Sequence, residues 1–154
     1  MYSDFPLSRL TLRVLFAILL VRINGATLGM AQEKQSRQSI EGVWEGGVGP
    51  FDPKTKTYKG GEYILTITKT TIAAKTKEGE DYGEGTYKLD PDRKTIDVVG
   101  TKGQIRGQTF LGIYSLEGDT LLWATTRQGT GQRPSKLEHN PDAAIWLITL
   151  KRRR

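Results

Sequence analysis

The residues able to carry out chemistry in this chain are few and poorly grouped for catalysis. The single histidine, His139, lies in the segment Leu137-Glu-His-Asn-Pro-Asp142, and the chain has no cysteine. Without a second imidazole or any thiolate, Glu138 and Asp142 do not complete a transition-metal site around His139. A serine nucleophile would need a Gly-x-Ser-x-Gly turn, which the sequence lacks. We therefore expect no metal, no cofactor and no enzymatic activity.

The acidic side chains form one local run whose spacing does not match a calcium loop. Glu78, Glu80, Asp81 and Glu84 lack the alternating oxygen ligands and the final glutamate of an EF-hand. A solvated hairpin tip is the simpler interpretation. Hydrolysis by paired carboxylates needs only two acids at the right distance in space, but no feature of the sequence selects such a pair.

The net charge does not predict a nucleic-acid partner. It is +6 for the whole chain and falls to +4 when residues 1–31, with their three arginines and one aspartate, are set aside. The C-terminal run Lys151-Arg-Arg-Arg154 accounts for that remaining excess. Because the rest of the chain is then neutral, no basic groove for nucleic acid is expected.

The first 31 residues have the order of a secretory signal. Arg9 and Arg13 precede the apolar run Val14–Val21, and the small residues Gly29 and Ala31 suit cleavage before Gln32. The run is too short to span a bilayer, which needs about 20 residues. We therefore expect an extracytoplasmic protein, periplasmic or secreted, that is not an integral membrane protein. An uncleaved membrane-proximal anchor is the alternative.

The rest of the chain is patterned for strands joined by short turns. A flexible lead-in over 32–39 precedes a single domain over 40–152. Eight segments rich in β-branched residues are expected as strands, at 42–45, 62–69, 71–76, 83–89, 95–99, 109–116, 119–127 and 144–151. No helical period is sustained. The pattern predicts an all-β fold, an eight-stranded antiparallel up-and-down barrel, with a two-sheet sandwich as the alternative.

One hairpin, Gly112–Ala124, is apolar on both faces. A turn at Glu117-Gly118 would pair Tyr114 with Leu121 and Gly112 with Trp123. Tyr114, Leu121 and Trp123 would then share the interior face, where Gly112 leaves space for the indole. Glycine at Gly118 suits the turn, and Asp119 is a candidate acceptor of backbone N–H groups there. The other apolar face must be covered by a loop, a terminal segment or a partner.

Several motifs resemble known barrel proteins. Gly42-Val43-Trp44 resembles the Gly-x-Trp motif of lipocalins, in which the tryptophan closes one end of the barrel beneath a basic residue of the last strand, here Lys151 or Arg152. A longer pattern runs through Gly85-Thr-Tyr-Lys-Leu-Asp90, Ile96-Asp97, Gly112-Ile-Tyr114, Gly118-Asp-Thr-Leu121, Arg133-Pro134 and Leu150-Lys-Arg152. It is similar to an uncharacterised lipocalin-like domain family abundant in Planctomycetes.

That resemblance covers about Ile40 to Arg152 and implies a lipocalin-like barrel, often with an export signal. The family has no established activity to carry over. Where its members often have a cysteine after the Gly-Asp-Thr-Leu strand, this chain has Trp123-Ala124, so a thiol role is absent.

The leading functional hypothesis is a small apolar or amphipathic ligand held in the barrel. The candidate lining residues are Tyr63, Leu65, Tyr87, Tyr114, Leu121 and Trp123, and a one-residue slip in register would exchange the two faces. Arg133 either pairs with Asp97 or Asp119 as a structural clamp, which we favour, or meets an anionic ligand group. The alternative function is a structural or protein-interaction module, for example an inhibitor with an envelope protein partner, with a packed interior.

Overall fold

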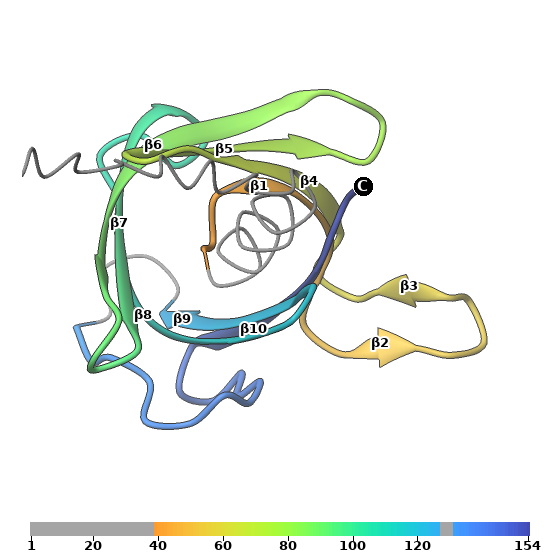
Figure 1. Ribbon diagram of the computed structural model, residues 1–154. Helices are drawn as coiled ribbons and strands as arrows, with labels where there is room; N and C mark the ends of the chain where they lie inside the picture. Colours follow the sequence, from red (N-terminus) through yellow and green to blue (C-terminus); the bar gives the residue numbers. More distant parts are fainter. Residues whose placement is uncertain (1–38, 127–130) are drawn as a thin grey trace, which may run out of the picture.

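The computed structural model describes residues 39–126 and 131–154, and its strands form a closed ring (Figure 1). The predicted signal segment therefore lies outside the described residues. The elements are β1 (Gly42–Val48), β2 (Phe51–Asp52), β3 (Thr57–Tyr58), β4 (Glu62–Ile67), β5 (Thr71–Thr76), β6 (Asp81–Asp90), β7 (Thr95–Gly103), β8 (Thr109–Glu117), β9 (Thr120–Thr126) and β10 (Ile145–Arg152).

Eight of these strands form one antiparallel, closed barrel in the order β1-β10-β9-β8-β7-β6-β5-β4. Every neighbouring pair within β4 to β10 is sequential in the chain, and β1 closes the ring by pairing with β10 on one side and β4 on the other. This is the predicted up-and-down, lipocalin-like barrel, and it excludes the two-sheet sandwich. No helix in the described ranges is long and apolar enough to cross a membrane.

The sequence pattern missed a small hairpin between β1 and β4. Strands β2 and β3 pair Phe51 with Tyr58 outside the barrel, and their rings lie 5.1 Å apart (Figure 1). Tyr58 packs on Gly47 of β1 so closely that a Cβ there would meet its ring at 2.2 Å. Each strand has only two residues. Such short strands give no detectable alternation in a sequence.

The predicted register of the β8–β9 hairpin is wrong, although its face assignment is confirmed. Tyr114 pairs with Trp123 and Gly112 with Thr125, so the turn is Gly118-Asp119. Gly118 has a φ of +58°, as the first central position of a type II′ turn requires. The pairing is displaced by an even number of residues, so no side chain changes face. Trp123 still covers Gly112, diagonally, and a Cβ on Gly112 would lie 2.4 Å from the indole Nε1.

The second apolar face of this hairpin is covered by the segment after β9. Residues 131–144, blue in Figure 1, lie outside the barrel wall, and Pro134 is buried. Ile113 lines one groove together with Arg133 and Pro134, and Ala124 on the same face is fully buried. The connection between β9 and β10 therefore supplies the cover that two apolar faces require.

The packed core fills one half of the barrel, which we call the closed end. Its buried side chains are Ile40, Trp44, Ile67, Ile96, Tyr114, Leu121 and Leu150. The alternation of apolar residues along each strand directs these side chains inward. The opposite half of the barrel holds the site described below.

Candidate functional site: the barrel cavity

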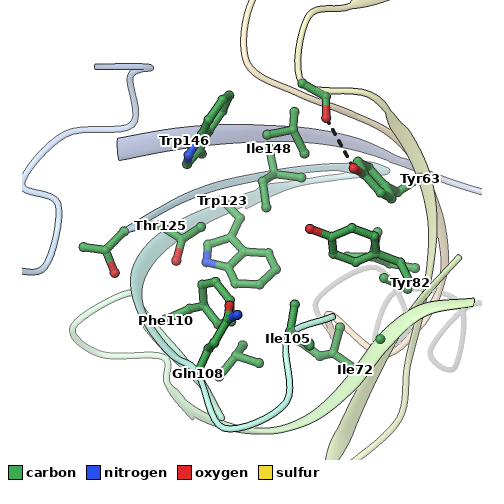
Figure 2. A pocket seen from close by; sticks show the side chains of 17 residues that line it. Tyr63, Ile72, Tyr82, Ile105, Gln108, Phe110, Trp123, Thr125, Trp146 and Ile148 are labelled. Carbon is green, nitrogen blue, oxygen red and sulfur yellow. Dashed lines mark hydrogen bonds between the residues drawn. The ribbon is translucent and has the colours of Figure 1, made fainter. Parts of the chain in front are cut away.

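A cavity of about 320 Å³ occupies the half of the barrel away from Trp44 (Figure 2). None of the largest fully buried core residues lines it. All eight barrel strands contribute to its wall, so it lies inside the barrel. The lining residues are Val48, Gly60, Tyr63, Leu65, Ile72, Ala74, Tyr82, Gly83, Val98, Ile105, Gln108, Phe110, Trp123, Thr125, Thr126, Trp146 and Ile148. We call this half the cavity end.

Aromatic rings dominate the wall of the cavity. Tyr63 and Tyr82 meet edge to face with ring centroids 5.0 Å apart on one side (Figure 2). Phe110, Trp123 and Trp146 come from β8, β9 and β10 on the other side. The β9–β10 register places Trp146 beside Thr125 and Ile148 beside Trp123, which brings these side chains to one face. The cavity therefore has aromatic surfaces on opposing walls.

A β-bulge directs Tyr82 into the cavity. On β6, Gly83 pairs with Ala74 and Asp81 pairs with Lys75, so Tyr82 is the extra residue of the shifted register. Simple alternation would place it outside with Glu84, because Gly83 and Gly85 face inward. Bulges commonly redirect a side chain in this way. Alternation along the sequence therefore does not predict Tyr82 as a lining residue.

The turn between β7 and β8 covers part of the cavity end. Its Ile105 projects among the lining residues and packs on Gly83, where a Cβ would meet Ile105 Cγ1 at 2.7 Å (Figure 2). Gln108 at the end of this turn donates its amide to the Gln104 carbonyl at 3.1 Å. The turn is thus held in place by backbone and side-chain contacts while it contributes one apolar and one polar group to the wall.

The polar groups of the wall are uncharged. The Tyr63 hydroxyl donates to the Gly60 carbonyl at 3.3 Å, and the Thr125 hydroxyl donates to the Leu111 carbonyl at 3.3 Å. Burial, with a smaller contribution from Tyr82, raises the pKa of Tyr63. The indole Nε1 of Trp123 is buried and has no hydrogen-bond partner among the described residues. The interior therefore disfavours negative charge and offers only neutral donors and acceptors.

All six predicted lining residues lie on the interior face, but only three reach the cavity. Tyr63, Leu65 and Trp123 line it. The other three, Tyr87, Tyr114 and Leu121, lie towards the closed end. Leu121 is fully buried in the core, and the Nζ of Lys94 lies 5.8 Å from the centroid of the Tyr114 ring. The Tyr87 hydroxyl donates to the Thr68 carbonyl at 2.7 Å. The structure thus divides the predicted set between core and cavity.

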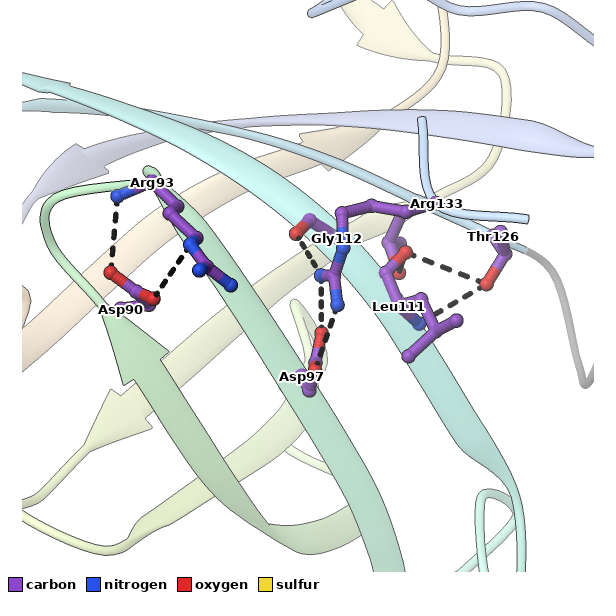
Figure 3. Close-up of polar contacts among 8 residues, drawn as sticks. Asp90, Arg93, Asp97, Leu111, Gly112, Thr126 and Arg133 are labelled. Carbon is purple, nitrogen blue, oxygen red and sulfur yellow. Dashed lines mark hydrogen bonds and ion pairs between the residues drawn. The ribbon is translucent and has the colours of Figure 1, made fainter. Parts of the chain in front are cut away.

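Arg133 lies outside the barrel and does not line the cavity. Its guanidinium donates to both carboxylate oxygens of Asp97, with Nη2···Oδ2 of 2.9 Å, and to the Gly112 carbonyl at 2.8 Å (Figure 3). The hydrogen bonds from Arg133 lower the pKa of Asp97, although partial burial opposes them. Of the partners considered for Arg133, the structure selects Asp97, and this clamp fixes the 131–144 segment against β7 and β8.

The Gly-x-Trp motif closes the other end of the barrel. Trp44 is fully buried, donates its indole N–H to the Ile40 carbonyl at 2.7 Å and lies beneath the Arg152 guanidinium, 4.2 Å from the ring. Arg152 also donates to the carbonyls of Ser39 and Glu41 at 2.6 Å. Of the two basic residues considered from the sequence, Arg152 is therefore the one over Trp44.

Two further motif residues support Arg152. A Cβ on Gly42 would lie 2.7 Å from its Nη1, so glycine leaves room for the guanidinium. Asp119 accepts the Arg152 backbone N–H at 2.8 Å, and its carboxylate lies 3.7 Å from the Arg152 Nε and 2.8 Å from the Arg154 guanidinium. The β8–β9 turn and the end of β10 are thereby joined.

The other candidate groups do not assemble into a reactive site. The His139 ring lies 5.1 Å from that of Trp146, outside the cavity lining. Asp81 and Glu84 pair separately with Lys75 and Lys102, each at 3.0 Å. Within residues 39–126 and 131–154, no three histidine, aspartate or glutamate side chains are arranged to hold a metal ion.

The missed lining residues differ in how much signal the sequence gives for them. Phe110 and Thr125 lie two residues along their strands from Gly112 and Trp123, which the sequence already places on the interior face, so alternation indicates them. Trp146 and Ile148 alternate in the last strand, for which no interior face was predicted. Tyr82, Ile105 and Gln108 depend on a bulge and on the path of a turn, for which no such signal exists.

Comparisons with models of protein families, with curated proteins and with solved structures gave no match.

Proposed function

We propose that this chain is an exported, non-catalytic lipocalin-like binding module that holds a small apolar or amphipathic ligand in the barrel cavity. One observation carries the proposal: a cavity of about 320 Å³ whose wall is built by every strand of the barrel. Ligand sites in proteins begin at about 300 Å³ and are lined mainly by apolar and aromatic side chains with a few polar groups.

The resemblance to the lipocalin-like family of Planctomycetes and the export signal belong to the same proposal. The stacking of Arg152 on Trp44 supports the lipocalin-like part of this proposal, because the Gly-x-Trp motif of lipocalins has a basic residue over its tryptophan. Export is tested by intact-mass measurement of the protein purified from its native envelope. A chain that begins at Gln32 is expected, and a chain that retains residues 1–31 would contradict cleavage at that point.

The alternative function, a structural or protein-interaction module, presupposes a packed interior. Only the closed end fits that description. If the protein copurifies from the envelope with a protein partner and without any small molecule, this alternative is favoured over ligand binding.

The binding proposal is tested with 1-octanol as the probe, by isothermal titration calorimetry and by fluorescence of the tryptophans that line the cavity. We expect saturable binding with one site. Ala74→Leu places a larger side chain in the cavity and should abolish it. Ala73→Leu is the matched control, because the neighbouring residue of β5 faces the other side of the sheet. Equal loss in both variants would contradict the proposal, and so would the absence of binding by octanol and by every other apolar or amphipathic probe.

A further inference from the structure

The cavity contains no charged side chain among its described lining residues. A carboxylate or ammonium group that a ligand placed inside the cavity would therefore lose its hydration without gaining an ionic partner there. The cost of burying an unpaired charge is much larger than that of burying a neutral polar group. The raised pKa of Tyr63 is an independent sign of the same environment, since burial disfavours its anion. The wall selects against ionised ligands.

The shape of the wall favours a flat ring. Tyr63 and Tyr82 form an edge-to-face pair on one side, and the indole of Trp123 lies across the cavity from them (Figure 2). Aromatic rings interact best with other rings in offset or edge-to-face arrangements, which add to the free energy of apolar burial. A flexible alkyl chain gains no such contacts and loses more conformational freedom when it binds.

The polar groups leave acceptors for a donor on the ligand. Gln108 uses its amide N–H to bind the Gln104 carbonyl, so its Oε1 remains as an acceptor. Thr125 uses its hydroxyl hydrogen to bind the Leu111 carbonyl, so its oxygen remains as a second acceptor. Both residues line the cavity beside Phe110 (Figure 2). An uncharged N–H or O–H donor on the ring is the complement of this pair.

We propose that the cavity selects a neutral, planar aromatic ligand that carries an N–H or O–H donor. This inference rests on the proposed function, since it specifies which ligand the cavity takes. It separates the protein from carriers of fatty acids or other anions.

The test compares three probes by titration calorimetry on the full chain: 2-naphthamide, its isosteric anion 2-naphthoate, and the alkyl amide decanamide. We expect 2-naphthamide to bind at least about tenfold more tightly than either of the others. If naphthoate binds as tightly as naphthamide, selection against charge is wrong; if decanamide does, selection for a ring is wrong. If none of the three probes and no octanol binds, the proposed function itself fails.

A pair of variants sharpens the charge argument. Gln108→Arg introduces a cation into the cavity and should raise the affinity for 2-naphthoate relative to 2-naphthamide at least about tenfold. Gln104→Arg adds the same charge to the exposed part of the same turn and should leave the preference unchanged. Equal shifts in both variants would overturn the inference, because the effect would then arise from the overall charge.

Discussion

Each end of the barrel contains a buried tryptophan, and the two differ in whether the indole N–H has a hydrogen-bond partner. At the closed end, the Trp44 N–H reaches the Ile40 carbonyl and a guanidinium covers its ring. At the cavity end, the buried Nε1 of Trp123 has no partner within the described residues. Buried polar groups are nearly always paired, so an unpaired one indicates a place where stability has not been maximised. The closed end is built for stability, and the cavity end leaves room for binding.

The largest expected effect compares alanine substitutions at the two ends. Trp44→Ala should lower the free energy of unfolding by ~3–5 kcal/mol, because it removes a fully buried indole and leaves a new cavity. Trp146→Ala removes a half-buried ring that already borders open space, and should cost less than about half as much. Urea denaturation followed by circular dichroism measures both. Equal losses would contradict a division between a stabilising end and a binding end.

The next effect concerns the cation over Trp44. Arg152→Lys keeps the charge but loses the planar group that covers the ring and reaches two backbone carbonyls. We expect a loss of ~1–3 kcal/mol in the free energy of unfolding. Arg154→Lys is the control, because that side chain is exposed and meets Asp119 at 2.8 Å on the surface of the same turn, and should change stability by less than about 0.5 kcal/mol. If Arg152→Lys left the free energy of unfolding unchanged, the positive charge alone would be enough to close this end of the barrel.

A smaller effect, which depends on pH, is expected at the clamp on the outer wall. Because Arg133 lowers the pKa of folded Asp97, the pair stabilises the fold above the unfolded aspartate pKa of about 4. The stabilisation is lost as the pH falls through the lower, folded value. Asp97→Asn should therefore lower the free energy of unfolding by ~1 kcal/mol at pH 7. At acidic pH its stability should equal that of the unmodified chain.

The control for this prediction is Asp92→Asn in the exposed β6–β7 turn, where no difference between pH 7 and acid is expected. Thermal unfolding from pH 2 to pH 7 measures all three proteins. A difference for Asp97→Asn that persists unchanged at low pH would show that the carboxylate charge does not hold the clamp.

The contrast between the ends also shows what a sequence can predict. The strands and their interior faces follow from alternation between turn residues, and the Gly-x-Trp motif predicts that Trp44 closes one end of the barrel. The β8–β9 register was not predicted, since turns at Glu117-Gly118 and Gly118-Asp119 both use the glycine and keep the same faces. Local sequence therefore predicts which face of the sheet a residue occupies. It predicts less well how far along the barrel axis that residue lies.

Height along the barrel is what separates core from cavity. Tyr114 and Trp123 are direct neighbours across the hairpin and both are buried in the apolar core, yet only Trp123 also lines the cavity. The volume left between opposite walls depends on the stagger of all eight strands and on the bulge that redirects Tyr82. No short segment encodes the combined effect of stagger and bulge. The sequence therefore left two alternatives for the interior, a ligand cavity or a packed core.

The smallest expected change in stability comes from filling the cavity. Ala74→Leu adds apolar atoms to open space without displacing a packed side chain, so the free energy of unfolding should change by less than about 1 kcal/mol while octanol binding is lost. The control Ala73→Leu should leave both properties nearly unchanged. If Ala74→Leu instead destabilised the fold by ~3 kcal/mol, the space would be too tight even for a leucine side chain, and the cavity end would be a second packed core. A stable, folded variant that no longer binds would show that the two ends have separate tasks, because stability would survive a change that removes binding.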